Sequence, residues 1–155
     1  MKPEIVDERN YMKNKKKFDK LRGGYYTPQA ITEFICKWII NKDTKKVLEP
    51  SCGDGKFLKA IVERIEKINL KLDITTDITG VELCIDEARK AMKYGTNVEC
   101  EDFFEFYRDE IVGKNNYDVI VGNPPFIRYQ DFDEKSRKIA FSYMKENRFH
   151  PTRLT

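Results

Sequence analysis

The segment GNPPF at residues 122–126 combines an amide, two prolines and an aromatic ring directly after the apolar run YDVIV. An ordinary turn does not need two prolines, and neither proline can donate a hydrogen bond to a neighbouring strand. An amino group on a flat base could lie between the side-chain oxygen of Asn123 and the backbone carbonyl of Pro124. Phe126 would offer a stacking face for a base pulled out of a duplex. Taken alone, the motif could also be a rigid turn.

A second polar motif, LEPSCGDG at residues 48–55, follows another short apolar run. Gly53 and Gly55 would let the backbone approach a ligand closely, because glycine has no Cβ. The motif lacks both the dinucleotide pattern GxGxxG and the lysine of a phosphate loop. Glu49 and Asp54 would repel a pyrophosphate and attract a cation, such as the sulfonium and ammonium of S-adenosylmethionine. The alternative is a glycine turn that joins a strand to a helix.

Two further motifs place acids after apolar runs. In GVEL, Glu82 could accept hydrogen bonds from both hydroxyls of a ribose. In EDFF, Asp102 could accept one from an adenine amino group, and Phe103 could lie against the purine face. A single acid at such a position is more often a helix cap. Three acids in register along one sheet edge, Glu49, Glu82 and Asp102, are hard to attribute to capping.

The elements that must position these motifs alternate along the chain. Short apolar runs of strand length are followed by segments with helical spacing, which predicts βαβ units and a parallel sheet. Ligands of such sheets bind beyond the carboxyl ends of the strands, where each motif lies. Before the first strand, we expect a helix with Thr27 as N-cap and Pro28 in the first turn. Its apolar residues at helical spacing are Ile31, Phe34, Ile35, Trp38 and Ile39.

Composition excludes several classes of protein. The 155 residues suffice for one domain, and 40% of them are hydrophobic. No apolar stretch approaches the roughly 20 residues that span a bilayer, and the N-terminus lacks the apolar core of a signal peptide. We therefore expect a cytoplasmic protein without a membrane segment. Four cysteines without a CxxC pair and a single histidine predict reduced, mostly buried thiols and no metal site.

Residues 1–22 are expected to form a basic N-terminal arm. The segment YMKNKKKFDKLR, residues 11–22, holds six basic residues and one acid. The arm could be solvated and partly disordered, or it could contact phosphates.

The order YYTP, LEPSCGDG, GVEL, EDFF, GNPPF resembles the adenine-N6 DNA methyltransferases of restriction–modification systems, in their gamma motif order. The resemblance covers about residues 20–130, and Asn-Pro-Pro-aromatic is its most specific element. It implies an α/β fold of the Rossmann-like, class I S-adenosylmethionine-dependent methyltransferase type, incomplete, with about four parallel strands and flanking helices. It also implies S-adenosylmethionine as cofactor and double-stranded DNA as partner.

The resemblance assigns residues to two tasks. The cofactor would be bound by Thr27, Glu49, Ser51, Gly53, Glu82, Asp102 and Phe103. The target base would be bound by Asn123, Pro124 and Phe126. Within the first set, Thr27 and Glu49 would hold the methionine part, Glu82 the ribose, and Asp102 with Phe103 the adenine.

Two departures from the family pattern matter. Cys84 stands where the family often has an acid, so a side-chain cap on the following helix is in doubt. Family members also continue through further strands and a target-recognition domain. We therefore expect residues 23–155 to form the N-terminal part of a catalytic domain that is inactive in isolation. The fourth strand should then be exposed, and the chain should self-associate there or cover the strand with residues 131–155.

Other functions remain open from the sequence. The same loop could serve a methyltransferase that acts on a protein glutamine or on RNA. The chain could also be a non-catalytic module that binds cofactor or DNA. The motif YYTP before the first strand favours the DNA enzymes.

Overall fold

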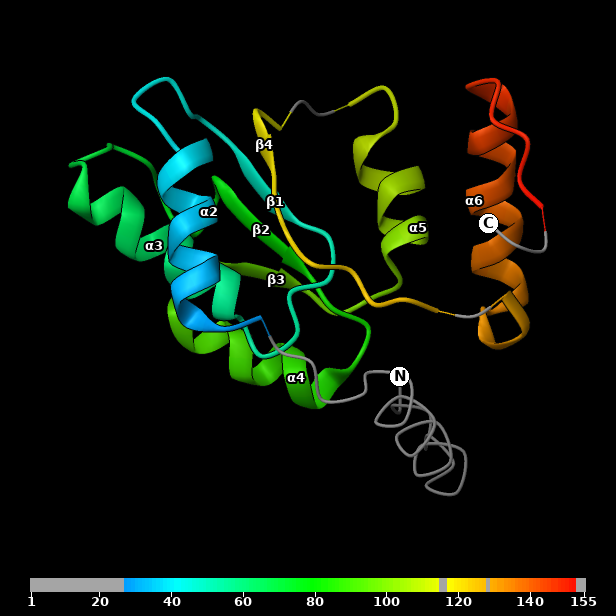
Figure 1. Ribbon diagram of the computed structural model, residues 1–155, viewed down its shortest axis with the longest axis horizontal. Coiled ribbons are helices and arrows are strands. Elements are labelled where there is room, and N and C mark those ends of the chain that lie inside the picture. The colour runs from blue at the N-terminus through cyan, green and yellow to red at the C-terminus, as the bar shows by residue number, and fades with distance from the viewer. Residues whose placement is uncertain (1–26, 115–116, 128, 153–155) are drawn as a thin grey trace, which may run out of the picture.

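The computed structural model describes residues 27–114, 117–127 and 129–152 (Figure 1). The expected basic arm, residues 1–22, lies outside the described residues. Four strands form one parallel sheet in the order β3-β2-β1-β4. Their bounds are Val47–Glu49 for β1, Ile78–Val81 for β2, Asn97–Glu99 for β3 and Val119–Ile120 for β4. The predicted α/β arrangement of about four parallel strands with flanking helices is confirmed.

Helices connect the strands and cover the sheet. Their bounds are Gln29–Ile39 for α2, Lys56–Lys67 for α3, Ile85–Ala91 for α4, Phe103–Phe106 for α5 and Glu134–Glu146 for α6. Short helices extend or precede three of them: η1 is Met92–Tyr94, η2 is Tyr107–Ile111 and η3 is Tyr129–Asp131.

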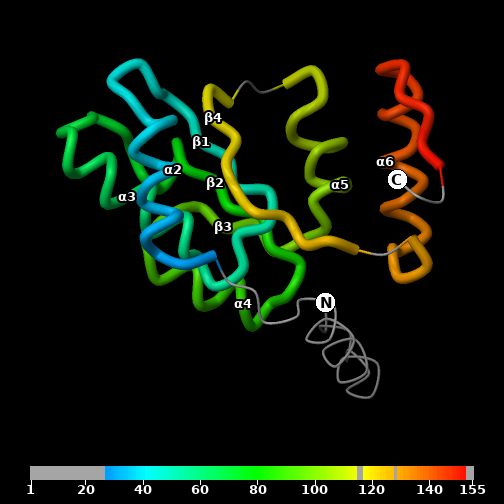
Figure 2. Tube along the Cα trace, in the orientation of Figure 1, coloured from blue at the N-terminus to red at the C-terminus, as the bar shows by residue number. Residues whose placement is uncertain are grey.

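The two faces of β1 build two separate cores, because successive side chains of a strand point to opposite faces. Val47 packs with Leu58 and other buried side chains of α2, α3 and α4 on one face. Leu48 packs with Val81 and Phe106 on the other face, under α5 and η2. In Figures 1 and 2, α6 stands beside α5 and lies farther from the sheet. Both faces of the sheet are thus covered by helices, as expected for parallel strands.

Asp118 fixes the start of the last strand against the start of the first. Its Oδ2 accepts hydrogen bonds from the backbone N–H groups of Lys45, at 2.9 Å, and Lys46, at 2.7 Å. These two bonds hold the pKa of Asp118 below its usual value, with the Lys46 bond contributing most. Leu48 then pairs with Ile120 on one side and with Thr79 on the other. β1 is therefore a central strand, and β4 is an edge strand among the described residues.

One prediction about α2 is wrong, and the burial of its side chains is not what its apolar spacing alone indicates. The carbonyl of Pro28, not Thr27, begins the helix, since it accepts hydrogen bonds from the N–H groups of Ile31 and Thr32. The buried face of α2 carries Thr32 and Cys36, and the Thr32 hydroxyl is satisfied by the Gln29 carbonyl at 2.8 Å. Ile35 and Ile39 pack against the core, whereas Ile31, Phe34 and Trp38 are exposed to 48%, 70% and 82%.

The position of α6 contradicts one expectation about β4, namely that the C-terminal residues cover it. α6 packs against α5, and Ile120 on β4 remains 63% exposed. The expectation that residues 131–155 cover this edge is therefore wrong for the described residues.

Other expectations concern thiols, metals and membranes. Cys36 and Cys52 are buried free thiols, whereas Cys84 is half-buried and Cys100 is exposed, so the cysteines are less buried than expected. Within residues 27–152, leaving aside the undescribed positions, no three His, Cys, Asp or Glu side chains are grouped to hold a metal ion. Each helix described is too short or too polar to cross a bilayer.

Candidate active site

The four sequence motifs meet at the edge of the sheet toward which all strands run. Helices α4 and α5 begin at this edge, and the chain leaving β4 passes it (Figure 1). The loop after β4 lies directly on the end of β1: a Cβ on Gly122 would be 3.5 Å from Cγ of Glu49 and 3.5 Å from Cδ of Pro50. The parallel topology therefore brings LEPSCGDG and GNPPF together, as the sequence predicts.

Glu49 is a buried acid with an unused oxygen. It ends β1, is 2% exposed, and its Oε2 has no hydrogen-bond partner among the described residues. Burial raises the pKa of Glu49 well above its usual value, and the negative charge of Glu82 adds to this, while the backbone N–H of Leu58 acts in the opposite direction. The hydroxyl oxygen of Ser51 is also buried without a partner. Since buried polar atoms are rarely left unpaired, these two oxygens point to a donor-bearing ligand.

The glycines of the β1 loop serve different purposes. Gly53 has φ 56°, and its N–H donates to Oε2 of Glu82 at 2.9 Å. Gly55 precedes α3 with φ 85°, and a Cβ there would lie 2.8 Å from the ring of Tyr94 and 2.9 Å from Cα of Ala91. Gly55 is thus required for packing against the end of α4 and for its backbone conformation, rather than for the approach of a ligand as expected.

Glu82 follows β2 and joins two loops. It is 3% exposed, and its Oε1 accepts from the backbone N–H of Cys84 at 2.7 Å while Oε2 accepts from Gly53. A carboxylate offers about four acceptor sites, so hydrogen bonds to backbone do not prevent it from accepting a ribose hydroxyl. Cys84 provides no side-chain cap to α4, in line with the doubt raised by its identity.

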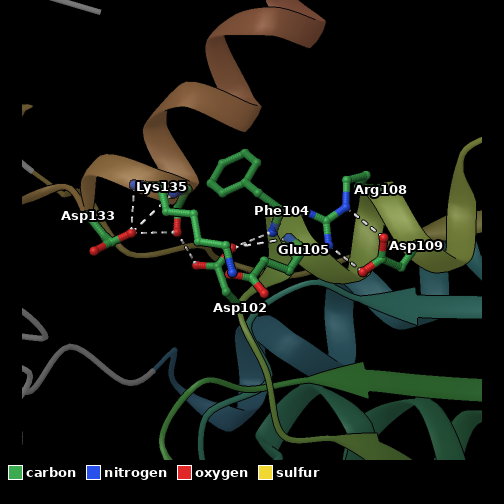
Figure 3. Close-up of polar contacts among 8 residues, drawn as sticks. Asp102, Phe104, Glu105, Arg108, Asp109, Asp133 and Lys135 are labelled. Carbon is green, nitrogen blue, oxygen red and sulfur yellow. Dashed lines mark hydrogen bonds and ion pairs between the residues drawn. The ribbon is translucent and has the colours of Figure 1, made fainter.

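Asp102 is the N-cap of α5. Its Oδ1 accepts from the N–H groups of Phe104, at 2.8 Å, and Glu105, at 3.2 Å. Its Oδ2 accepts from the hydroxyl of Ser136 on α6 at 2.9 Å. Figure 3 shows Asp102 lying close to Asp133 and Lys135 at the start of α6. The capping interpretation therefore holds for Oδ1, and Oδ2 faces a residue that the sequence does not single out.

Phe103 belongs to an aromatic cluster between α5 and α6. Its ring centroid lies 5.7 Å from that of Phe104 and 6.2 Å from that of Tyr107. An apolar pocket of about 320 Å³ runs along this cluster; it is lined by Phe103, Phe104, Tyr107, Phe132, Ala140, Phe141, Tyr143 and Met144. The surroundings of Phe103 are thus flat and apolar, as a purine face requires.

The GNPPF loop presents its functional groups to solvent. Asn123 and Pro124 are exposed, and Phe126 is 93% exposed. Nδ2 of Asn123 donates to the hydroxyl oxygen of Thr27 at 3.3 Å, a contact between residues 96 positions apart. An amide whose NH₂ is turned to Thr27 has its carbonyl oxygen available for another donor. Thr27, which is expected to hold the cofactor, therefore also contacts the GNPPF loop.

Sequence reasoning missed Ser136. The segment Asp133–Ser136 carries a helix-start pattern, and Oδ2 of Asp133 accepts from the N–H groups of Lys135 and Ser136 at 2.9 and 3.1 Å. That pattern could have predicted where α6 begins. Its contact with Asp102 depends on how α6 packs, which no local signal encodes.

Residues 9–154 match the family model for N-6 DNA methylases. Among curated proteins, type II methyltransferase M.AccI of Acinetobacter calcoaceticus is 34% identical over 140 residues, covering 83% of this chain and 23% of its own. Type II methyltransferase M.BanIII of Aneurinibacillus aneurinilyticus is 30% identical over 152 residues, covering 78% of this chain and 25% of its own. The chain thus spans about a quarter of the length of these relatives.

Solved structures agree on the fold. A crystal structure assigned to the modification subunit of a type I restriction enzyme from Vibrio vulnificus has a TM-score of 0.57 at 21% identity, covering 88% of this chain and 34% of that one. A structure assigned as a class I S-adenosylmethionine-dependent methyltransferase from Listeria monocytogenes has a TM-score of 0.55 at 16% identity, covering 89% and 45%. At this identity the likeness shows the fold, which is an incomplete Rossmann-like methyltransferase fold.

Proposed function

Because the chain belongs to the N-6 DNA methylase family, we propose that it is the cofactor-binding part of an enzyme that methylates the N6 amino group of adenine in DNA. The activity is proposed for the whole protein, since the chain spans about a quarter of its curated relatives. The observation that carries the proposal is the meeting of a buried, partly unpaired acid, Glu49, with the loop that bears Asn123.

The cofactor proposed is S-adenosylmethionine, and the residues present fit it. Oε2 of Glu49 and the hydroxyl of Ser51 are buried acceptors without partners, which suits the ammonium of its methionine part. Glu82 stands where a ribose would be bound, and Asp102 with Phe103 where its adenine would be bound. When bound, S-adenosylmethionine supplies an electrophilic methyl group attached to sulfur.

Asn123 and Pro124 would activate the target nitrogen by accepting hydrogen bonds. The lone pair of an exocyclic amine is delocalised into the ring, so this nitrogen is a poor nucleophile. If Oδ1 of Asn123 and the Pro124 carbonyl each accept one N–H, the nitrogen is favoured in the pyramidal geometry that exposes its lone pair. The exposed ring of Phe126 would stack on the flipped base. Neither group can remove the proton, which leaves to water after transfer.

We also propose that a second copy of the chain pairs along β4 when no further strand covers it. β4 is an edge strand with an exposed apolar side chain, Ile120, and such edges recruit other strands.

Calorimetric titration of the chain with S-adenosylmethionine tests the cofactor assignment. We expect weak binding that Glu49→Gln reduces by about tenfold or more, since a charge-assisted hydrogen bond is lost. Glu63→Gln is the matched control, because Glu63 lies on the outer side of α3, 46% exposed, beside Lys59. Absence of binding by the folded chain at millimolar cofactor, or equal effects of the two substitutions, would contradict the proposal.

A further inference from the structure

Ser136 is a buried hydroxyl residue with an unexpected partner. It lies in the first turn of α6 and is 3% exposed. Its Oγ is 2.9 Å from Oδ2 of Asp102 and 3.3 Å from Oδ2 of Asp133. A hydroxyl has one hydrogen to donate. Asp133 already accepts hydrogen bonds from two backbone N–H groups at the helix start. The hydroxyl therefore donates to Asp102, which is the nearer of the two acceptors.

The carboxylate of Asp102 has one acceptor site left after these contacts. An ionised carboxylate offers about four lone-pair sites. Oδ1 uses two of them for the N–H groups of Phe104 and Glu105, and Oδ2 uses one for Ser136. The three donors come from two different helices and fix the plane of the carboxylate. The remaining site therefore lies on Oδ2 and has a defined direction.

Several contacts keep α6 in the position that this bond requires. Nζ of Lys135 lies 2.6 Å from Oε1 of Glu105, next to Asp102 in Figure 3. The rings of Tyr107 and Tyr143 meet edge to face with centroids 5.1 Å apart. The start of α6 is thus attached to the start of α5 by a salt bridge and a hydrogen bond, and ring packing joins η2 to the last turn of α6.

We propose that Ser136 is a positioning residue for adenine recognition: its hydroxyl orients Asp102 so that the remaining site on Oδ2 accepts the 6-amino group of the cofactor's adenine. This inference rests on the proposed function, which places a cofactor adenine at Asp102. Without the hydroxyl, the carboxylate keeps its capping bonds through Oδ1 but loses the donor that fixes Oδ2. The chain would then distinguish less well between a purine with an amino group and one with a carbonyl at that position.

The test compares two ligands that differ at that position. S-adenosylhomocysteine carries the 6-amino group, and S-inosylhomocysteine carries a 6-carbonyl that repels a carboxylate. Calorimetric titration of the full 155-residue chain gives the ratio of their dissociation constants. We expect the unaltered chain to prefer the adenosyl ligand by about tenfold or more, and Ser136→Ala to lower that preference at least threefold.

Two further variants separate positioning from packing. Ser136→Cys keeps nearly the same side-chain volume but is a weak donor, so it should lose discrimination as the alanine variant does. Ser142→Ala is the helix control, because Ser142 is exposed on α6 and its hydroxyl donates only to the Ile139 carbonyl among the contacts described, at 2.7 Å. It should leave the ratio unchanged. Circular dichroism shows whether each variant folds. If the alanine variant does not fold, the cysteine variant alone is compared with the unaltered chain.

The outcomes separate the two proposals. If Ser136→Ala and Ser136→Cys weaken both ligands equally, or leave the ratio unchanged, Ser136 is structural and this inference is overturned. The inference also fails if the unaltered chain binds both ligands equally well, although cofactor binding would then stand. If the unaltered chain binds neither ligand, the proposed function fails and the inference fails with it.

Discussion

At the scale of single residues, Glu49 combines the binding role proposed for it with a cost in stability. Burial, together with the charge of Glu82, raises its pKa in the folded chain above the unfolded value. The folded state then binds the proton more tightly, so the free energy of unfolding falls as pH rises above the unfolded pKa. Glu49 therefore lowers the free energy of unfolding at neutral pH, and the ligand proposed to pair with it would offset this cost.

The first prediction follows from the raised pKa of Glu49, which makes the folded chain less stable as pH rises. Glu49→Gln should raise the melting temperature at pH 8 by about 3 °C or more, since glutamine has no carboxylate that must be buried or protonated on folding. The difference should shrink toward pH 4, where the native carboxyl is protonated. Thermal melts of both chains across this range measure it, with Glu63→Gln as the exposed control. A difference that stays constant or grows at low pH would contradict the argument.

A second prediction concerns the amide of Asn123. Its contact with Thr27 would fix which end of the amide faces the target base proposed to bind there. In the whole enzyme, Thr27→Val should lower kcat about fivefold, the effect of one hydrogen bond, whereas Thr27→Ser should keep most of the rate. Single-turnover methylation at saturating cofactor separates this effect from cofactor affinity. A loss in Thr27→Ser as large as that in Thr27→Val would contradict this role of the hydroxyl, because the serine variant keeps it.

At the scale of elements, the sequence predicts the strands well because each carries a short apolar run beside a glycine or acid. The register of motifs at one sheet edge follows from parallel pairing, so Glu49 and Gly122 could be placed together in advance. The buried face of α2 could not be predicted in full, because Thr32 is polar. Its hydroxyl can be buried only because it donates to a carbonyl of its own helix. Nor could the position of α6 be predicted, since aromatic packing on α5 gives no periodic signal.

The edge strand gives a third prediction. Ile120→Lys should reduce self-association of the chain, because a charge on an exposed edge opposes pairing with another strand. Light scattering over a range of concentrations measures this. Met92→Lys is the control, since Met92 is exposed to 43% on η1, which leads into β3 at the opposite edge of the sheet. A chain that stays monomeric without any substitution would show that the edge does not recruit a partner.

At the scale of the whole molecule, the fourth prediction concerns the reaction product. DNA treated with the complete enzyme should release N6-methyladenine on digestion, because the chain belongs to the N-6 DNA methylase family. The isolated chain should transfer no methyl group to DNA, because flipping and holding a base requires contacts beyond the exposed loop. Mass spectrometry of the nucleosides distinguishes the products. Finding only N4-methylcytosine, or robust turnover by the isolated chain, would contradict this view.

The pairing of β1 with β4 also has a consequence for biosynthesis. Lys45 and Lys46 bond to Asp118 across 73 and 72 positions, so the central strand acquires its second neighbour only after that much more chain has been made. At ribosomal rates of about 5 to 20 residues per second, this delay lasts roughly 4 to 14 seconds. Throughout that interval one side of β1 has no strand to pair with. Slow translation before Tyr117 would lengthen the period in which the nascent chain is open to chaperones and to aggregation.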